Sequence, residues 1–224
     1  MAYRGILLDF YGTVVHEDDV LIAEIRAEIS AAMPDPIEPR AVGSLWWEIF
    51  SRSFVASFGD DFQTQRNIEQ ASLDEVRRTL EAQCDVDAMC QRLFDFWQQP
   101  PLFDDAVPFL NDVTVPVVVV SNIDRCDIEA AIEAHGLVFD DVITSEDVRS
   151  YKPRPELFHA GLVSLGMEPH EVLHIGDSTT SDVAGAAALG IPVAWVNRKG
   201  KAAPTDPRPD YEVAQLTELA AVML

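Results

Sequence analysis

Two aspartates near the ends of short apolar runs are the residues of this chain best suited to chemistry. Asp9 follows the run Gly5–Leu8, and Asp177 closes the segment that begins with Val172–Ile175. A strand that delivers a carboxylate to the C-terminal edge of an open α/β sheet places it where such sheets bind ligands. There the carboxylate can act as a nucleophile, a metal ligand or both. For Asp9 alone, a turn-capping role is an equally good interpretation.

A hydroxyl and a lysine follow at later segments. Ser121-Asn122 follows the apolar run Val117–Val120, so Ser121 can hydrogen-bond an oxyanion or simply cap a helix. Lys152 stands in Lys-Pro-Arg-Pro, where Pro155 suits the first turn of a helix. The chain has only three lysines, and this one is stiffly held. We therefore predict that Lys152 faces the carboxylates and neutralises them, rather than lying on the surface.

A second acid, Asp182, follows Asp177 at a distance of five residues. Two carboxylates on a glycine-containing loop make a hard oxygen site that suits Mg²⁺. His174 lies within the preceding apolar run, and we predict a packed core histidine there rather than a ligand.

Apolar runs alternate with helix-like segments through most of the chain, which predicts an α/β fold with a parallel sheet covered on both faces. The expected strands are Gly5–Leu8, Val115–Val120, Asp141–Thr144, Val172–Ile175, Pro192–Val196 and Tyr211–Val213. The expected helices between them are Asp104–Asp112, Asp124–His135, Pro155–Leu165, Thr180–Leu189 and Leu216–Met223.

One long stretch breaks this alternation and carries apolar residues at helical spacing only. Its four expected helices are Val20–Ala32, Ala41–Phe58, Asn67–Ala82 and Val86–Gln98. We predict a core domain of residues 1–15 and 101–224, with a helical cap domain of residues 16–100 inserted after the first strand. Such an insert over the reactive edge is a natural lid.

Composition excludes several classes of protein. The net charge is −22, with 16 basic against 38 acidic residues, which argues against a nucleic-acid binder. No apolar run is long enough to span a membrane, and the N-terminus lacks the pattern of an export signal. The three cysteines lack metal-site spacing and indicate free thiols, so we expect a cytoplasmic protein. We also expect a monomer or homodimer that acts on a small molecule.

Four segments in order resemble those of the haloacid dehalogenase (HAD) superfamily. They are Asp-x-x-Gly-Thr at 9–13, Ser-Asn at 121–122, Lys-Pro-x-Pro at 152–155 and Gly-Asp-Ser-x-x-x-Asp at 176–182. The match covers the whole chain and includes a helical insert where that superfamily has its C1 cap. The resemblance implies a Rossmann-like, doubly wound parallel sheet with an inserted four-helix cap.

The resemblance also implies roles for individual residues. Asp9 would be the covalent nucleophile and Lys152 the residue that orients it. The remaining roles are a helper that hydrogen-bonds Asp9 or the phosphoryl group (Thr13), substrate binders (Ser121, Asn122, Tyr11), and a Mg²⁺ site (Asp9, the Tyr11 carbonyl and Asp177, with Asp182 beside them).

Tyr11 is the main departure from the phosphatases of this superfamily, which usually carry a second Asp at that position. That Asp protonates the leaving group and later activates water, a contribution of ~10²–10⁴-fold. His16 or Glu17, just beyond the loop, could replace it. Asp-x-Tyr-Gly-Thr instead resembles the 2-haloacid dehalogenase branch, whose halide leaving group needs no proton.

Two features oppose the dehalogenase interpretation. That branch has Ser-x-Asn-x-x-Asp in the fourth segment and no metal, whereas this chain has Asp177, Thr179 and Asp182. The branch also has a cap arginine that grips the substrate, and here that position falls on Trp47. Arg40 or Arg52 could substitute for it, and Trp46 and Trp47 are expected in the core of the cap.

The main prediction from the sequence is a Mg²⁺-dependent phosphatase that acts on a small phosphomonoester through an aspartyl-phosphate on Asp9. The alternatives are a metal-independent 2-haloacid dehalogenase with an aspartyl ester intermediate, and a binding protein that kept the fold without catalysis.

Overall fold

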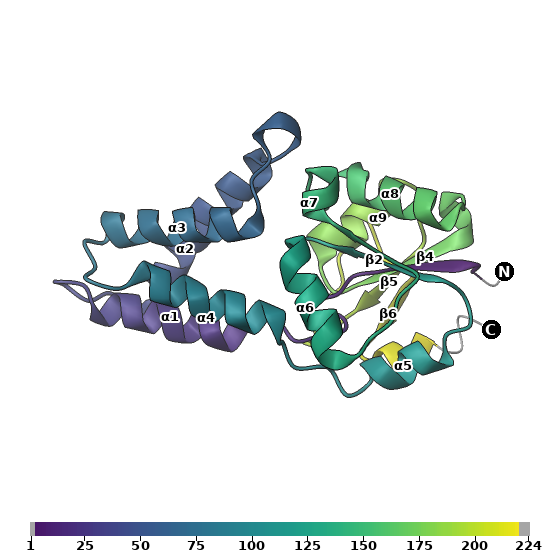
Figure 1. Ribbon diagram of the computed structural model, residues 1–224, viewed down its shortest axis with the longest axis horizontal. Helices are drawn as coiled ribbons and strands as arrows, with labels where there is room; N and C mark the ends of the chain where they lie inside the picture. Colours follow the sequence, from purple (N-terminus) through teal and green to yellow (C-terminus); the bar gives the residue numbers. More distant parts are fainter. Residues whose placement is uncertain (1–2, 220–224) are drawn as a thin grey trace. The chain divides into compact units, whose positions relative to one another are not determined.

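The computed structural model describes residues 3–219 and divides the chain into two compact units (Figure 1). Unit 1 contains residues 1–17, 101–122 and 135–224, and unit 2 contains residues 18–100 and 123–134. The predicted boundaries of the core and cap domains stay a prediction.

Unit 1 is built on a six-stranded parallel sheet of order β3-β2-β1-β4-β5-β6. The first and fourth strands lie side by side at its centre, with Leu8 paired to Ile175. This sheet confirms the predicted α/β, Rossmann-like fold class. The strands are β1 (Gly5–Leu8), β2 (Val117–Ser121), β3 (Asp141–Thr144), β4 (Val172–Gly176), β5 (Val193–Val196) and β6 (Tyr211–Val213).

The central strands are buried on both faces, which explains their nearly continuous apolar sequences. Side chains alternate between the faces along each strand. Leu7 and Val120 point to one face and pack with Leu157 and Phe158 of helix α8 (Pro155–Leu165). Figure 1 shows α8 and α5 covering opposite faces of the sheet. This two-sided burial fixes the strand ends, and therefore the reactive edge.

The remaining helical segments of unit 1 are short. They are α5 (Ala106–Asp112), α7 (Ser145–Val148), η2 (Pro169–Glu171), η3 (Thr179–Ala184), α9 (Gly185–Ala187) and η4 (Leu216–Leu219). The prediction of one regular helix at 180–189 is wrong, because Thr179–Ala184 forms a wide π-helical turn before the short α9. In that turn the Val183 amide reaches back to the Ser178 carbonyl. Of the helix expected at 216–223, only residues up to 219 lie within the described part.

Unit 2 is helical, as predicted for the insert, but includes one segment from beyond it. Its helices are α1 (Asp19–Ala31), α2 (Pro39–Ala56), η1 (Gly59–Asp61), α3 (Gln65–Thr79), α4 (Val86–Gln98) and most of α6 (Arg125–His135).

Side chains just after β2 bind the start of α3. The Asp124 carboxylate accepts hydrogen bonds from the backbone amides of Gln65 (2.7 Å) and Arg66 (3.0 Å). Asp127 is fully buried and receives the Arg66 guanidinium on both oxygens. Carboxylates at a helix N-terminus satisfy amides that have no partner within the helix. This explains why residues 123–134 group with unit 2.

The two adjacent tryptophans of α2 have different environments. Trp46 is buried, and its indole N–H donates to Glu69 at 2.8 Å. Trp47 is 68% exposed, so the expectation that it belongs to the core of the insert is wrong. A helix turns by about 100° per residue, so of two adjacent residues one can face the core while the other faces outward. Trp47 stacks on Phe50 along the outside of α2.

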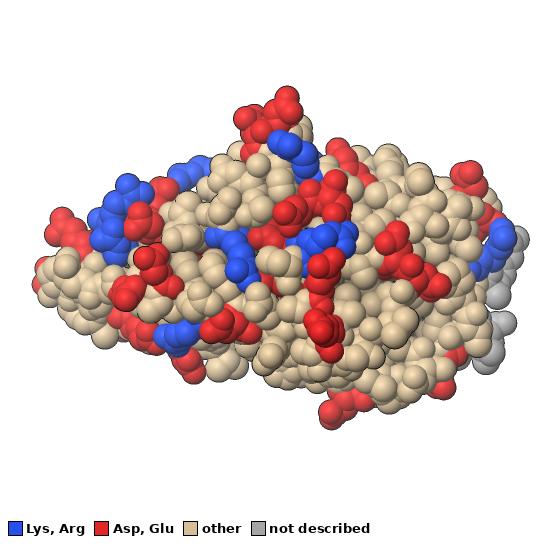
Figure 2. All heavy atoms as spheres, viewed as in Figure 1, with Lys and Arg blue, Asp and Glu red and all other residues tan. Residues whose placement is uncertain are grey.

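Acidic side chains are spread over the face of the molecule shown in Figure 2, with lysine and arginine side chains among them. All three cysteines are free thiols. Within residues 3–219, no helix combines the length and the apolar character needed to cross a bilayer.

Candidate active site

The loop after β1 folds into a tight turn that presents Asp9. The Asp9 amide donates to the Ile175 carbonyl of β4, and the Val14 amide closes the turn on the Phe10 carbonyl, both at 2.8 Å. The Thr13 hydroxyl donates to Asp9 Oδ2 at 2.9 Å. Asp9 is only 6% exposed, so these contacts hold its carboxylate in one orientation. The structure thus brings together Asp9 and Thr13.

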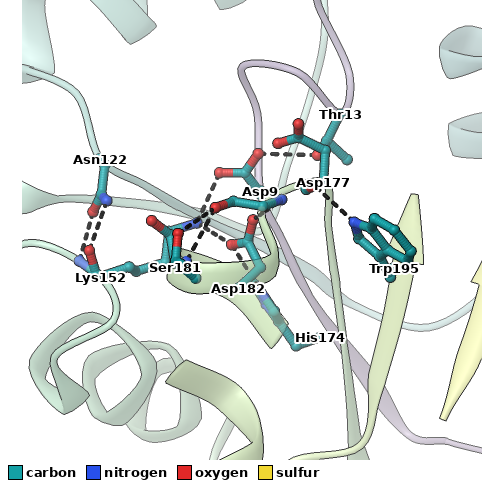
Figure 3. A network of polar contacts seen from close by, with 11 residues as sticks. Asp9, Thr13, Asn122, Lys152, His174, Asp177, Ser181, Asp182 and Trp195 are labelled. Atoms are coloured by element: carbon teal, nitrogen blue, oxygen red, sulfur yellow. Dashed lines mark hydrogen bonds and ion pairs between the residues drawn. The ribbon is translucent and has the colours of Figure 1, made fainter. Parts of the chain in front are cut away.

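Lys152 lies against the same carboxylate, in the place expected from its stiff loop (Figure 3). Its ammonium donates to Asp9 Oδ1 and to Asp182 Oδ1, each at 2.7 Å, and the residue is 1% exposed. Burial alone would lower the pKa of Lys152, but Asp182 and Asp9 together raise it above its usual value. Lys152 is therefore a fixed positive charge at the nucleophile.

Asn122 positions the backbone of that lysine. Its side-chain oxygen accepts from the Lys152 amide at 2.7 Å, and its side-chain nitrogen donates to the Lys152 carbonyl at 3.1 Å. Both ends of the amide group are thus engaged with Lys152. Ser121, the other expected binder of substrate, is buried at the C-terminal end of β2, beside β1. Contact of either residue with a substrate stays a prediction.

Asp182 is the central acceptor of the site. Besides Lys152, it receives the Ser178 amide on Oδ2 at 3.0 Å and faces His174 Nε2 across 2.9 Å. Burial would raise the pKa of Asp182, but Lys152 and His174 hold it well below its usual value. A Cβ on Gly176 would lie 2.3 Å from the Asp182 Cγ, so only glycine allows this approach.

Asp177 lies beside the nucleophile without a comparable set of partners. Its carboxylate packs against Gly12, where φ is +87° and a Cβ would be 2.7 Å from the carboxylate. Trp195 fixes its backbone, because the indole N–H donates to the Asp177 carbonyl at 2.7 Å. Burial, followed by the charges of Asp9 and Asp182, raises the pKa of Asp177 to about 8. Asp177 is therefore mostly protonated near pH 7, and its ionisation adds a negative charge that a cation at this site would compensate.

These carboxylates fit a hard divalent cation. Asp9, Asp177 and Asp182 each offer one oxygen within 4.8 Å of the others. Because Asp182 already accepts three donors, Asp9 and Asp177 are the better ligands, and Mg²⁺ prefers oxygen donors of this kind. A cation between them would relieve the repulsion that raises the pKa of Asp177.

The two groups suggested as substitutes for the missing acid are held in other contacts. The His16 ring stacks on Phe103 with centroids 3.9 Å apart. The Glu17 carboxylate forms an ion pair with Lys199 at 2.7 Å. Tyr11 follows the nucleophile with its ring edge-on to Phe10.

Sequence reasoning missed two functional candidates, His174 and Arg198. His174 is in the core, as predicted, but it also forms a hydrogen bond with Asp182. Arg198 donates to the Thr13 carbonyl at 2.7 Å and to Asp105 at 3.1 Å, with its guanidinium 3.8 Å above the Phe103 ring. An arginine two residues after the strand Val193–Val196, at the same edge as Asp9, was the available signal.

A family model described as haloacid dehalogenase-like hydrolase matches residues 3–190. The chain belongs to this family. Membership confirms the predicted superfamily and makes the protein a hydrolase, in which Asp9, Lys152 and the carboxylates beside them form the candidate active site.

Relatives of this HAD hydrolase differ in how much of the chain they match. The (S)-2-haloacid dehalogenase of Pseudomonas putida is 28% identical over 97% of this chain and 95% of its own length. Pyrophosphatase PpaX of Bacillus pumilus is 30% identical but matches 53% of this chain and 56% of its own length. The crystal structure of the L-2-haloacid dehalogenase RSc1362 has a TM-score of 0.81, with 19% identity, over 100% of this chain and 99% of that one.

Proposed function

We propose that this HAD hydrolase cleaves the carbon–halogen bond of a small 2-haloacid through an ester on Asp9. The observation that carries the proposal is Tyr11 in the position of a second acid. Its side chain cannot serve as a carboxylic acid, and Glu17 nearby is paired with Lys199. A site without a carboxylic acid at this position suits a halide, which departs as a stable anion and needs no proton. The nearly full-length similarity to (S)-2-haloacid dehalogenases supports the same chemistry.

In the first step, an Asp9 oxygen attacks the carbon that bears the halogen, and the halide leaves with the bonding pair. Lys152 and the Thr13 hydroxyl, both bonded to Asp9, orient the carboxylate for this attack. In the second step, water attacks the ester carbonyl and restores the Asp9 carboxylate, releasing a 2-hydroxy acid and a proton. Lys152 stabilises the negative charge that develops on the ester carbonyl oxygen.

The phosphatase prediction remains as a second candidate because of Asp177. An anionic Asp177 beside Asp9 would repel the carboxylate of a haloacid, whereas a cation held there would attract a phosphate ester. Asp9, the Tyr11 carbonyl and Asp177 would hold Mg²⁺, with Asp182 beside them. When bound, Mg²⁺ neutralises the charge of a phosphoryl group. Asp9 would then be the nucleophile toward phosphorus, with Lys152 as a second positive charge.

Two assays on one preparation distinguish the candidates. The first measures halide release from (S)- and (R)-2-chloropropionate and 2-bromopropionate, and the second measures phosphate release from a phosphomonoester panel that includes an aryl phosphate. Each is run with Mg²⁺ and with EDTA, and Asp9→Asn serves as the control. We expect halide release that requires Asp9 and persists in EDTA.

Phosphate release that requires both Mg²⁺ and Asp9, without halide release, would overturn the dehalogenase proposal in favour of the second candidate. A single turnover in ¹⁸O-labelled water adds a test of the covalent step. Because water attacks the carboxyl carbon of the ester, one labelled oxygen should remain on Asp9 and be detected by peptide mass spectrometry.

A further inference from the structure

A histidine lies directly behind the charged groups of the site. His174 is in the middle of β4, is fully buried, and places Nε2 2.9 Å from Asp182 Oδ1 (Figure 3). The chain of contacts then runs from Asp182 to Lys152 and from Lys152 to Asp9, each over 2.7 Å. The imidazole therefore lies three contacts from the nucleophile.

The hydrogen bonds assign the proton on this imidazole. Asp182 accepts from Lys152 on Oδ1 and from the Ser178 amide on Oδ2, so it is an ionised acceptor. Nε2 must then carry the hydrogen that lies between His174 and Asp182. Within residues 3–219, Nδ1 has no hydrogen-bond partner, and the ring is edge-on to Phe158 with centroids 5.1 Å apart. A second proton on Nδ1 would be a buried, unsatisfied donor, so the arrangement favours a neutral ring with Nε2–H.

We propose that His174 is a positioning residue, whose Nε2–H fixes the Asp182 carboxylate so that Asp182 in turn fixes the Lys152 ammonium against Asp9. The proposal goes beyond the function given above and rests on it only for the roles of Asp9 and Lys152. The proposal explains why this core position holds a histidine rather than an apolar residue of similar size.

The need for such a residue follows from the flexibility of lysine. Lys152 has a long side chain, and its ammonium can donate hydrogen bonds in many directions, unlike a planar guanidinium. Its position therefore depends on its two acceptors, Asp9 and Asp182. Asp9 must be free to form and break a covalent bond, which leaves Asp182 as the permanent anchor. Without the His174 donor, the Oδ1 side of that anchor can rotate, and an error of ~1 Å in a reacting group costs about 10²-fold in rate.

Three substitutions of His174 separate positioning from packing. In His174→Gln, the side-chain amide reaches the position of Nε2 and can donate to Asp182. In His174→Asn, the amide lies near the position of Nδ1 and falls short, and His174→Leu removes the donor altogether. His159→Leu on the exposed side of α8 is the matched control.

With the substrate class that the wild type turns over, we expect kcat of His174→Leu and His174→Asn to fall by about 10–100-fold while KM changes by less than threefold. His174→Gln should retain kcat to within about threefold, and His159→Leu should behave as the wild type. Equal kcat values for the Gln, Asn and Leu variants, all folded by circular dichroism, would overturn the proposal.

A spectroscopic readout tests the proposal without any turnover. The chain has only three lysines, so ¹⁵N-lysine labelling gives a simple spectrum in which a Lys152→Met sample identifies the buried ammonium. We expect the Lys152 ammonium signal to stay in place in His174→Gln and to shift or broaden in His174→Leu and His174→Asn. An unchanged signal in all three variants would refute the positioning role.

The two readouts distinguish failure of the inference from failure of the proposed function. If the wild type releases neither halide nor phosphate, the proposed function fails, and the lysine spectrum still decides whether His174 positions Lys152. If His174→Leu does not fold, the comparison of the Gln and Asn variants decides it.

Discussion

Glu69 in the helical unit gives a sharp prediction about stability and pH. Its side chain is 5% exposed on α3 and accepts one hydrogen bond, from Trp46 Nε1. The nearby Asp18 carboxylate accepts the Trp97 indole N–H at 2.7 Å. Burial, followed by the charge of Asp18, raises the pKa of Glu69 from 4.5 to about 8. The folded protein therefore holds Glu69 protonated at neutral pH, whereas the unfolded chain ionises it.

The sign and size of the effect follow from this difference. The folded pKa is raised, so the stabilisation is fully present below pH 4.5 and is lost as the pH rises to about 8. At about 1.4 kcal/mol per pKa unit, the total loss is about 5 kcal/mol, of which about 3 kcal/mol is lost by pH 7. Glu69→Gln keeps an oxygen for Trp46 and cannot ionise, so it avoids this loss.

The assay is urea unfolding of the wild type and Glu69→Gln at pH 4.5, 7 and 9, followed by tryptophan fluorescence. Three of the four tryptophans, Trp46, Trp47 and Trp97, are in the helical unit. We expect the two proteins to differ little at pH 4.5 and the variant to be more stable by several kcal/mol at pH 9. Other titrating groups are shared and cancel in the difference. Glu75→Gln, an exposed position on the same helix, is the control. A difference that does not change with pH would refute the argument.

Three further predictions concern unit 1. Lys152→Met leaves Asp9 and Asp182 buried without their cation, so it should lower the free energy of unfolding in urea by about 3–5 kcal/mol. Lys199→Met is the control, and an equal effect of both variants would contradict the buried charge balance. The ammonium of Arg198→Lys cannot bind the Thr13 carbonyl and Asp105 at once, so the variant should lower the free energy of unfolding by about 1.5–3 kcal/mol in the same assay. No loss would mean that one ammonium suffices. Tyr11→Asp supplies the missing acid, so it should raise Mg²⁺-dependent phosphate release by about 10²-fold or more without raising halide release; no gain would show that another group already acts as the acid.

The sequence predicted those features that depend on local pattern. Buried parallel strands are apolar along their whole length, so Gly5–Leu8 was placed at its observed bounds. The outer strands Asp141–Thr144 and Tyr211–Val213 were also placed at their observed bounds, although they contain polar residues and are only partly buried. Because all strands of a parallel sheet end at one edge, the same pattern also placed Asp9 and Asp177 together. The stiff loop around Lys152 indicated a lysine that faces the carboxylates, and the structure places its ammonium against Asp9.

The features that could not be predicted depend on contacts between distant residues. His174 has the sequence context of a core residue, and only the position of Asp182 across the turn makes it a hydrogen-bond donor. The role of Arg198 requires knowing that the end of β5 lies next to the Thr13 carbonyl. Trp47 was misplaced because residue type alone does not tell which of two adjacent tryptophans on a helix faces the core; Trp46 does, and Trp47 is exposed.

The grouping of residues 123–134 with the helical unit has a consequence for protein engineering. Exchange of residues 18–100 between relatives, at the apparent ends of the insertion, would separate Asp124 and Asp127 from the α3 backbone and the arginine that they bind. Each chimera would then contain buried carboxylates chosen for a different helix. A modular exchange of this unit therefore requires two segments of the chain, and substitutions in α6 have to be compatible with those in α3.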